Sequence, residues 1–279
     1  MKLIWSLANK NPLTPHGQYV YDMFYVSIQM AKDLGYQTVL YGTTDAVDRL
    51  GNYVDEVHNI DNIEYILFDD LKIYIWKTRN DEYITIDGDM FLYSPLIFNR
   101  NSKTFLSFDE IVKKPATNEI EIGLNTLNNL NTFTSLIPEW NIESKRSFST
   151  NLIYWKENNG LLQYFIESYE KLRNWYFENK NILVEANDEL DSHKSLISHL
   201  ICEHLLERLI DYYSLEYDEI RPDWHNSYSH WQGNDKFIND IKINGIKLLV
   251  EKHKTIGGNI KNTYDYLLNE KMIQPFLYL

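Results

Sequence analysis

Short apolar runs alternate with segments of helical periodicity over the first ninety residues. The runs of strand length lie at residues 2–8, 37–42, 54–60 and 81–89. Helices are indicated at residues 18–34, at 46–51 and within 65–79, the last from about Asp69, which is an acceptable N-cap. Gly35 follows the first of these as a helix C-terminal cap. Strand and helix in alternation predict a mostly parallel sheet with helices on its faces, an α/β fold.

The second half of the chain has a less regular pattern. Residues 99–147 are polar and rich in Asn, and the weaker strand signals of this half lie at residues 104–108, 119–123 and 215–220. Amphipathic helices are predicted at residues 161–179, 194–213 and 238–272, the last with breaks at Gly245 and at Gly257-Gly258. No linker of Pro, Gly and Ser divides the chain, so we expect a single domain.

Composition and charge narrow the class of protein. Of the 279 residues 44% are hydrophobic, which is typical of a globular chain, and the net charge is −13. The negative charge argues against a protein that binds nucleic acid by neutralising phosphates. Cys202 is the only cysteine, so an internal disulfide is excluded and a reducing compartment is expected. We find neither a signal-peptide pattern nor an apolar stretch long enough for a membrane span, and predict a soluble, cytoplasmic protein.

Residues 83–92, YITIDGDMFL, place two carboxylates inside an apolar run. Asp-Gly is a common hairpin-turn dipeptide, so a turn is one interpretation of Asp87-Gly88-Asp89. The apolar flanks favour a site at the tip of a core strand. Two carboxylates so close repel each other unless a cation lies between them, and a hard divalent ion with oxygen ligands meets that need. Gly88 is expected to let the backbone and a ligand approach closely.

A second group of polar residues lies at 229–237, SHWQGNDKF. His230 can complete an oxygen-rich site that accepts Mn²⁺. Gly233 allows close approach to phosphate oxygens, and Lys236 supplies a point charge for a diphosphate. The other interpretation is a loop histidine with an unrelated lysine.

Together the two segments resemble the motifs of family 8 glycosyltransferases of GT-A fold, the glycogenin and lipopolysaccharide galactosyltransferase group. ITIDGDMFL is similar to the DxD strand, HWQGNDK is similar to the family's H-x-x-G-x-x-K motif, and their order agrees. The resemblance implies that Asp87, Asp89 and His230 bind Mn²⁺ or Mg²⁺. It also implies that Gly233 and Lys236 hold the diphosphate of a nucleotide sugar, with UDP as the expected nucleotide.

The same resemblance suggests further ligand contacts. Asp45, in the TTD segment expected to form a loop after the second strand, is a candidate for the base or ribose, and Lys72 for the nucleotide or sugar. The family's Asn-Ala-Gly-like segment is matched most nearly by SFSTNLIYW at residues 147–155, with Ser149, Thr150 and Asn151 as polar candidates for the donor sugar. The glycine of that segment is missing here.

An acidic residue near the reacting carbon is also implied, and two stretches can supply it. The first contains Asp188 and Asp191, and the second contains Glu203 among apolar residues. A carboxylate that faced the core at Glu203 would be costly without a partner, which makes that position a candidate. For each of these acids, an ordinary helix-surface residue is the alternative, and the sequence assigns no catalytic base.

The expected protein is therefore a metal-dependent, hexosyltransferase-like enzyme with a mixed, mostly parallel GT-A sheet. Residues 1–98 would form the nucleotide-binding half, 99–237 the sugar and acceptor half, and 238–279 a C-terminal helical segment. It would transfer a sugar, with retention, to a glycan, protein or small molecule. Two alternatives stay open: a nucleotidyltransferase that makes nucleotide sugars, and a non-catalytic binding protein of this fold. The transferase interpretation requires His230 and both aspartates to be close enough to bind the same metal ion.

Overall fold

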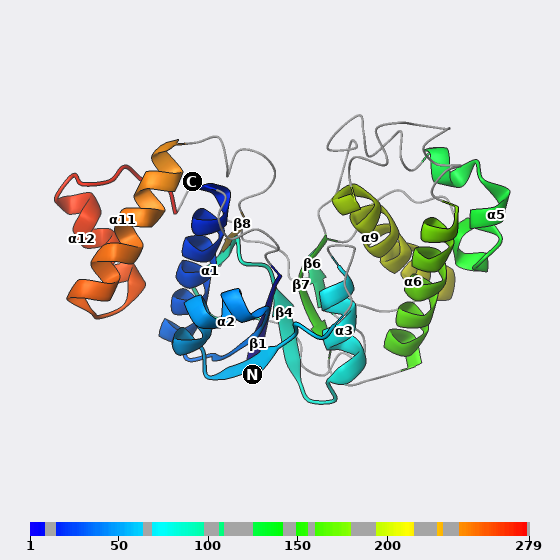
Figure 1. Ribbon diagram of the computed structural model, residues 1–279, viewed down its shortest axis with the longest axis horizontal. Helices are drawn as coiled ribbons and strands as arrows, with labels where there is room; N and C mark the ends of the chain where they lie inside the picture. Colours follow the sequence, from blue (N-terminus) through cyan, green and yellow to red (C-terminus); the bar gives the residue numbers. More distant parts are fainter. Residues whose placement is uncertain are drawn as a thin grey trace. The chain divides into compact units, whose positions relative to one another are not determined.

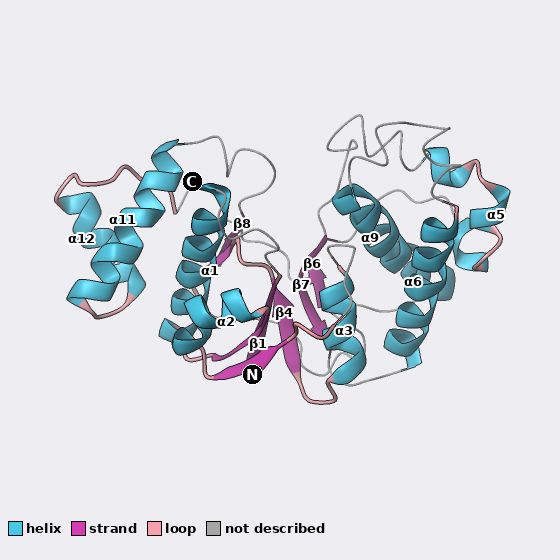
Figure 2. Cartoon of the chain, viewed as in Figure 1, coloured by secondary structure: helices cyan, strands magenta, loops and turns pink. Residues whose placement is uncertain are grey.

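The chain divides into two compact units, which are described separately. The computed structural model describes residues 1–8, 15–63, 69–97, 106–108, 125–141, 149–155, 160–179, 194–214, 228–230 and 240–277 (Figures 1 and 2). Unit 1 comprises residues Met1–Ile63, Tyr83–Ile97 and Arg221–Leu279, and unit 2 comprises Glu64–Glu82 and Phe98–Ile220. Both units therefore contain segments that are distant in the sequence. The single domain and its boundaries at 98 and 237 stay predictions.

A parallel sheet forms the centre of unit 1. In spatial order its strands are β3 (Glu56–Asn59), β2 (Gln37–Gly42), β1 (Lys2–Leu7) and β4 (Tyr83–Ile86). Each pairing between neighbours in this order is parallel. Leu3, Ile4 and Trp5 are fully or almost fully buried on β1, as expected of a strand with both faces covered. The carboxyl ends of β1, β2 and β4 therefore meet at one edge of the sheet.

The described helices of unit 1 belong to its first segment, residues 1–63, and to its last, residues 221–279. They are α1 (Pro15–Asp33), α2 (Thr44–Leu50), the 3₁₀ turn η1 (Gly51–Tyr53), α11 (Asp240–Ile256) and α12 (Ile260–Asn269). α1 contacts the sheet through Ser27, which accepts a hydrogen bond from Trp5 Nε1 at 3.0 Å. α11 contacts α1 through His253, whose Nδ1 lies 2.8 Å from the Tyr25 hydroxyl.

The two predicted glycine breaks near the C-terminus have different outcomes. Gly257 and Gly258 have φ values of 76° and 85° between α11 and α12, so the predicted break there is confirmed. The break predicted at Gly245 is wrong, because α11 runs through it. A Cβ at position 245 would lie 2.4 Å from the ring of Phe276, so close packing explains this glycine.

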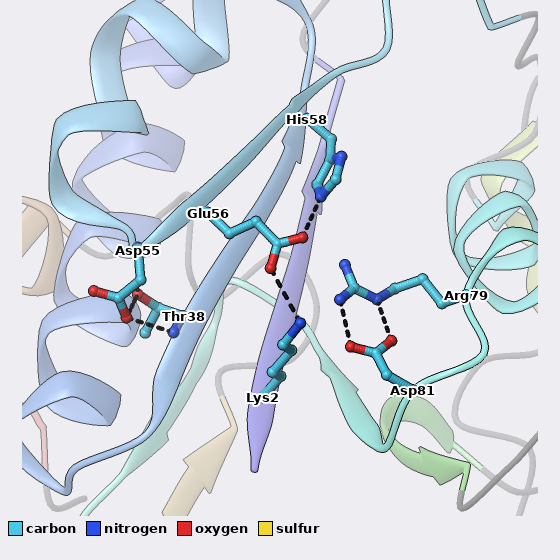
Figure 3. Close-up of polar contacts among 7 residues, drawn as sticks. All are labelled: Lys2, Thr38, Asp55, Glu56, His58, Arg79 and Asp81. Atoms are coloured by element: carbon cyan, nitrogen blue, oxygen red, sulfur yellow. Dashed lines mark hydrogen bonds and ion pairs between the residues drawn. The ribbon is translucent and has the colours of Figure 1, made fainter.

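Polar contacts fasten the edge strand β3 to its neighbours (Figure 3). The Asp55 carboxylate, just before β3, accepts hydrogen bonds from the Thr38 backbone N–H at 2.8 Å and from its hydroxyl at 3.0 Å. On β3 itself, Glu56 lies 3.2 Å from Lys2 Nζ and 2.6 Å from His58 Nε2. These side chains tie β3 to β2 and β1 in addition to the backbone ladder.

A second, two-stranded sheet in unit 1 joins β5 (Met90–Leu92) to β8 (Tyr228–His230). The pairing is antiparallel, and the register sets Met90 opposite His230 and Leu92 opposite Tyr228. The three residues of β5 are buried. This pairing brings together segments that a long stretch of sequence separates.

Unit 2 is built from helices and an antiparallel strand pair. Its elements are α3 (Asp70–Thr78), β6 (Leu106–Phe108), α5 (Asn131–Thr134), the 3₁₀ turn η2 (Pro138–Asn141), β7 (Ser149–Trp155), α6 (Gly160–Glu178) and α9 (Lys194–Tyr213). β6 and β7 pair antiparallel, which confirms the strand signal at 104–108. The core is aromatic: the Trp76 ring on α3 lies 5.5 Å from that of Trp155 and 5.8 Å from that of Phe165.

The described strands and helices confirm the predicted fold class. The β1–β2, β1–β4 and β2–β3 pairings are parallel and the β6–β7 pairing is antiparallel, so the α/β class with a mixed, mostly parallel sheet and flanking helices is as expected. The strand signals at 119–123 and 215–220 lie outside the described residues. Within the described part of the chain, no helix is long and apolar enough to cross a membrane.

Candidate functional site

The Asp87-Gly88-Asp89 segment forms a turn that joins two different sheets. Met90 N–H donates to the Asp87 carbonyl oxygen at 3.2 Å, which closes the turn. The strand before it, β4, pairs with β1, and the strand after it, β5, pairs with β8. Gly88 is not among the glycines with positive φ, whereas a type I′ hairpin turn would require one. The hairpin interpretation is therefore wrong, and the turn lies at the carboxyl end of a core strand.

Packing against α1 accounts for glycine at position 88. A Cβ there would lie 2.1 Å from two ring carbons of Phe24, a distance that no real side chain tolerates. The space that was expected to admit a ligand at Gly88 is therefore occupied by Phe24. The aspartates on either side of Gly88 extend from a turn whose backbone is pressed against the ring.

The two carboxylates have different environments. Asp89 is buried, with 7% of its surface exposed, while Asp87 is half-buried. Burial raises the pKa of the Tyr19 phenol on α1, and the nearby Asp89 and Asp22 carboxylates raise it further. The Asp89 carboxylate is thus close enough to Tyr19 to disfavour ionisation of its phenol.

The β5–β8 register connects the two sequence motifs. Because His230 is the Cα partner of Met90, the backbone of His230 lies beside the residue that follows Asp89. Directly paired residues in antiparallel strands have Cα atoms about 5 Å apart. The His230 side chain lies outside the described part of the structure. The first residue of the HWQGNDK motif therefore lies beside the DxD segment at the level of the backbone.

These residues suit a hard or borderline divalent cation. Carboxylate oxygens are ligands for Mg²⁺ and Mn²⁺, and an imidazole nitrogen favours Mn²⁺ over Mg²⁺. Among the side chains that the structure describes, no group of three or more His, Cys, Asp and Glu could hold a metal ion. Two of the three predicted ligands, Asp87 and Asp89, have described side chains, so the complete set of three ligands stays a prediction.

Asp45 lies in α2 and not in a loop, which corrects the expected placement. It is in the first helical turn, where acidic side chains are favoured. Its carboxylate accepts a hydrogen bond from the Tyr21 hydroxyl and forms an ion pair with Arg49 Nε at 3.2 Å. Arg49 Nη1 in turn donates to Gln18 at 2.8 Å. Asp45 therefore joins α2 to α1, and its role toward a base or ribose stays a prediction.

Lys72 and the predicted donor-sugar stretch come together inside unit 2. Lys72 is buried on α3, and its Nζ donates to the Thr150 carbonyl oxygen at 3.1 Å and lies 3.7 Å from Asp69 Oδ1. Thr150 sits on β7 between Ser149 and Asn151. Asn151 is buried, while the Ser149 side chain lies outside the described part. Their contacts with a nucleotide sugar stay predictions.

The candidate acid Glu203 does not face the core fully. It is half-buried on α9, beside Cys202, whose thiol pKa is raised well above its ordinary value by burial and by the Asp69 charge. The fully buried acid on α9 is Glu207, 3.9 Å from His204 Nδ1. The other predicted positions Asp188, Asp191, Gly233 and Lys236 lie outside the described residues.

The sequence did not single out Glu139, which is a further deeply buried acid among the described residues of unit 2. It lies in η2 with 1% of its surface exposed and accepts hydrogen bonds from Tyr164 at 3.0 Å and Tyr213 at 2.6 Å. Both tyrosines belong to helices, α6 and α9. No local pattern marks this contact, because its three members are distant in the sequence.

Comparison with known proteins finds similarity at the level of structure. No family model and no curated protein matches the chain. Among solved structures, the chain is similar to the glycosyltransferase GlyE of Streptococcus pneumoniae TIGR4, with a TM-score of 0.48 and 7% sequence identity. The match covers 98% of this chain and spans 64% of the length of GlyE.

Proposed function

We propose that this chain is a metal-dependent glycosyltransferase that transfers a sugar from a nucleotide-sugar donor, a UDP-sugar by preference, to an acceptor with retention at the anomeric carbon. The β5–β8 pairing is the observation that carries the proposal, because it pairs His230, the first residue of one family 8-like motif, with the residue that follows Asp89 in the other. Parallel strands that end at the same edge also favour ligand binding there.

In this proposal the residues of unit 1 bind the donor diphosphate. Asp87 and Asp89 hold the cation with His230, and Gly233 and Lys236 contact the diphosphate oxygens. The bound metal would neutralise charge on the departing nucleoside diphosphate. Because Asp89 is buried, we expect little reorganisation of its side chain when the cation binds.

The proposal is tested by following nucleoside diphosphate release from a panel of UDP-, GDP- and other nucleotide sugars, with and without Mn²⁺. We expect Mn²⁺-dependent hydrolysis by the wild type and a loss of at least about a hundredfold in Asp89→Asn, because a metal ligand is lost. Asp48→Asn is the matched control, since Asp48 is an exposed acid on α2 in the same unit.

The other outcomes identify the alternatives. Pyrophosphate-dependent formation of a nucleoside triphosphate would replace the proposal with a nucleotidyltransferase. Binding of a nucleotide sugar without turnover would indicate a non-catalytic binding protein. Hydrolysis that survives in Asp89→Asn would refute the assigned metal site.

A further inference from the structure

Two residues of α1 hold the turn that carries Asp87 and Asp89. Phe24 packs its ring against the Cα of Gly88. One helical turn later, Ser27 donates its hydroxyl hydrogen to the Met90 carbonyl oxygen at 2.6 Å. Residues three apart on a helix lie on the same face. α1 therefore contacts the turn at its centre and at its end.

The hydrogen bond from Ser27 has a fixed direction. Ser27 is fully buried, and its oxygen accepts the indole N–H of Trp5, which is a donor only, at 3.0 Å. The single hydroxyl hydrogen is thus committed to Met90. This chain of bonds runs from β1 through α1 to the first residue of β5, and Met90 is the residue paired with His230.

We propose that Phe24 and Ser27 are positioning residues for the metal site: α1 fixes the separation and direction of the two carboxylates, and Gly88 is required because Phe24 occupies the space of its side chain. The inference rests on the proposed function. It gives a role in the metal site to α1, a helix that lies outside both sequence motifs.

The alternative is that these contacts serve folding stability alone. Two glycines of unit 1 allow the distinction. A methyl group at Gly88 would enter the Phe24 ring, and a methyl group at Gly245 in α11 would lie 2.4 Å from the Phe276 ring. Both substitutions create the same kind of packing conflict, but the Gly88 conflict lies between the two carboxylates.

The test is a titration of the protein with Mn²⁺ alone, with the free ion followed by EPR, at a temperature where circular dichroism shows every variant folded. We expect Gly88→Ala to bind Mn²⁺ at least about tenfold more weakly than the wild type, the range typical for partners outside the metal's own ligands. Gly245→Ala is expected to lose stability and to keep the wild-type affinity.

A compensating substitution makes the test specific. Phe24→Val removes the ring atoms that a methyl at position 88 would strike, so the double variant Phe24→Val, Gly88→Ala should return to within about threefold of the wild type. Ser27→Ala should also weaken Mn²⁺ binding, since the Met90 carbonyl loses its fixed donor.

The outcomes separate this inference from the proposed function. A wild type that binds no Mn²⁺ overturns the metal site and this inference with it. If the wild type binds Mn²⁺ and Gly88→Ala binds equally well, or if Phe24→Val fails to restore binding to Gly88→Ala, the positioning role alone is overturned.

Discussion

Two buried charges of unit 2, Asp69 and Lys72, lie beside the stretch that was expected to contact a sugar. Lys72, Asp69 and Thr150 are almost completely buried, and Lys72 Nζ is bound by a carbonyl oxygen and a carboxylate. A buried cation of this kind is stable only while its partners remain, and a buried anion left alone is costly. At the residue scale, the observed contacts give Lys72 a structural role.

Lys72→Met is therefore expected to lower the free energy of unfolding by about 3 kcal/mol, because the buried Asp69 loses a cation 3.7 Å away. Urea denaturation measures this change. Lys77→Met is the control on the same helix: its pair with Glu170 is about half exposed, and its loss should cost about 0.5 kcal/mol or less. Equal stabilities for the two variants would contradict the structural role of Lys72.

Some contacts that join elements of unit 1 cannot be recognised from the local sequence pattern. Asp55 fastens β3 to β2 through the backbone and hydroxyl of Thr38. Burial alone would raise the pKa of Asp55, but these hydrogen bonds and Lys32 lower it below the ordinary value. Folding thus stabilises the ionised form of the Asp55 carboxyl relative to its protonated form.

The stability that Asp55 contributes should depend on pH. Its folded pKa is lowered, so the contribution is complete above the unfolded pKa of about 4 and is lost as the pH falls through the folded pKa. We expect Asp55→Asn to be less stable by about 1 kcal/mol at pH 7, a figure reduced for partial exposure. The difference should shrink below pH 4 in thermal melts. A difference that is constant from pH 7 to pH 3 would contradict this account.

At the scale of the whole molecule, periodicity predicted most of the described elements because each buries a recognisable apolar face. β1, α1, β2, α6 and α9 lie close to their predicted bounds. Gly245 and Asp45 were placed wrongly because the ring of Phe276 and the hydroxyl of Tyr21 come from distant segments.

The candidate site, too, was predictable in its local motifs and not in its contacts between distant segments. The two motifs were recognisable in the sequence, since their residue types suit a cation and a diphosphate. Neither the β5–β8 register nor the contact of Phe24 with Gly88 could be predicted, because both depend on pairings between remote segments. The β5–β8 pairing is the non-local contact that sets the backbone of His230 beside the residue that follows Asp89.

The central claim is that Asp87, Asp89 and His230 bind one ion. Electron spin-echo spectroscopy of Mn²⁺ bound to the protein tests it directly, because a coordinated imidazole imposes a ¹⁴N modulation on the signal. We predict this modulation in the wild type and in His58→Ala, a control on β3, and its loss in His230→Ala with weakened binding in Asp89→Asn. Bound Mn²⁺ without ¹⁴N modulation, or modulation that persists in His230→Ala, would contradict the account.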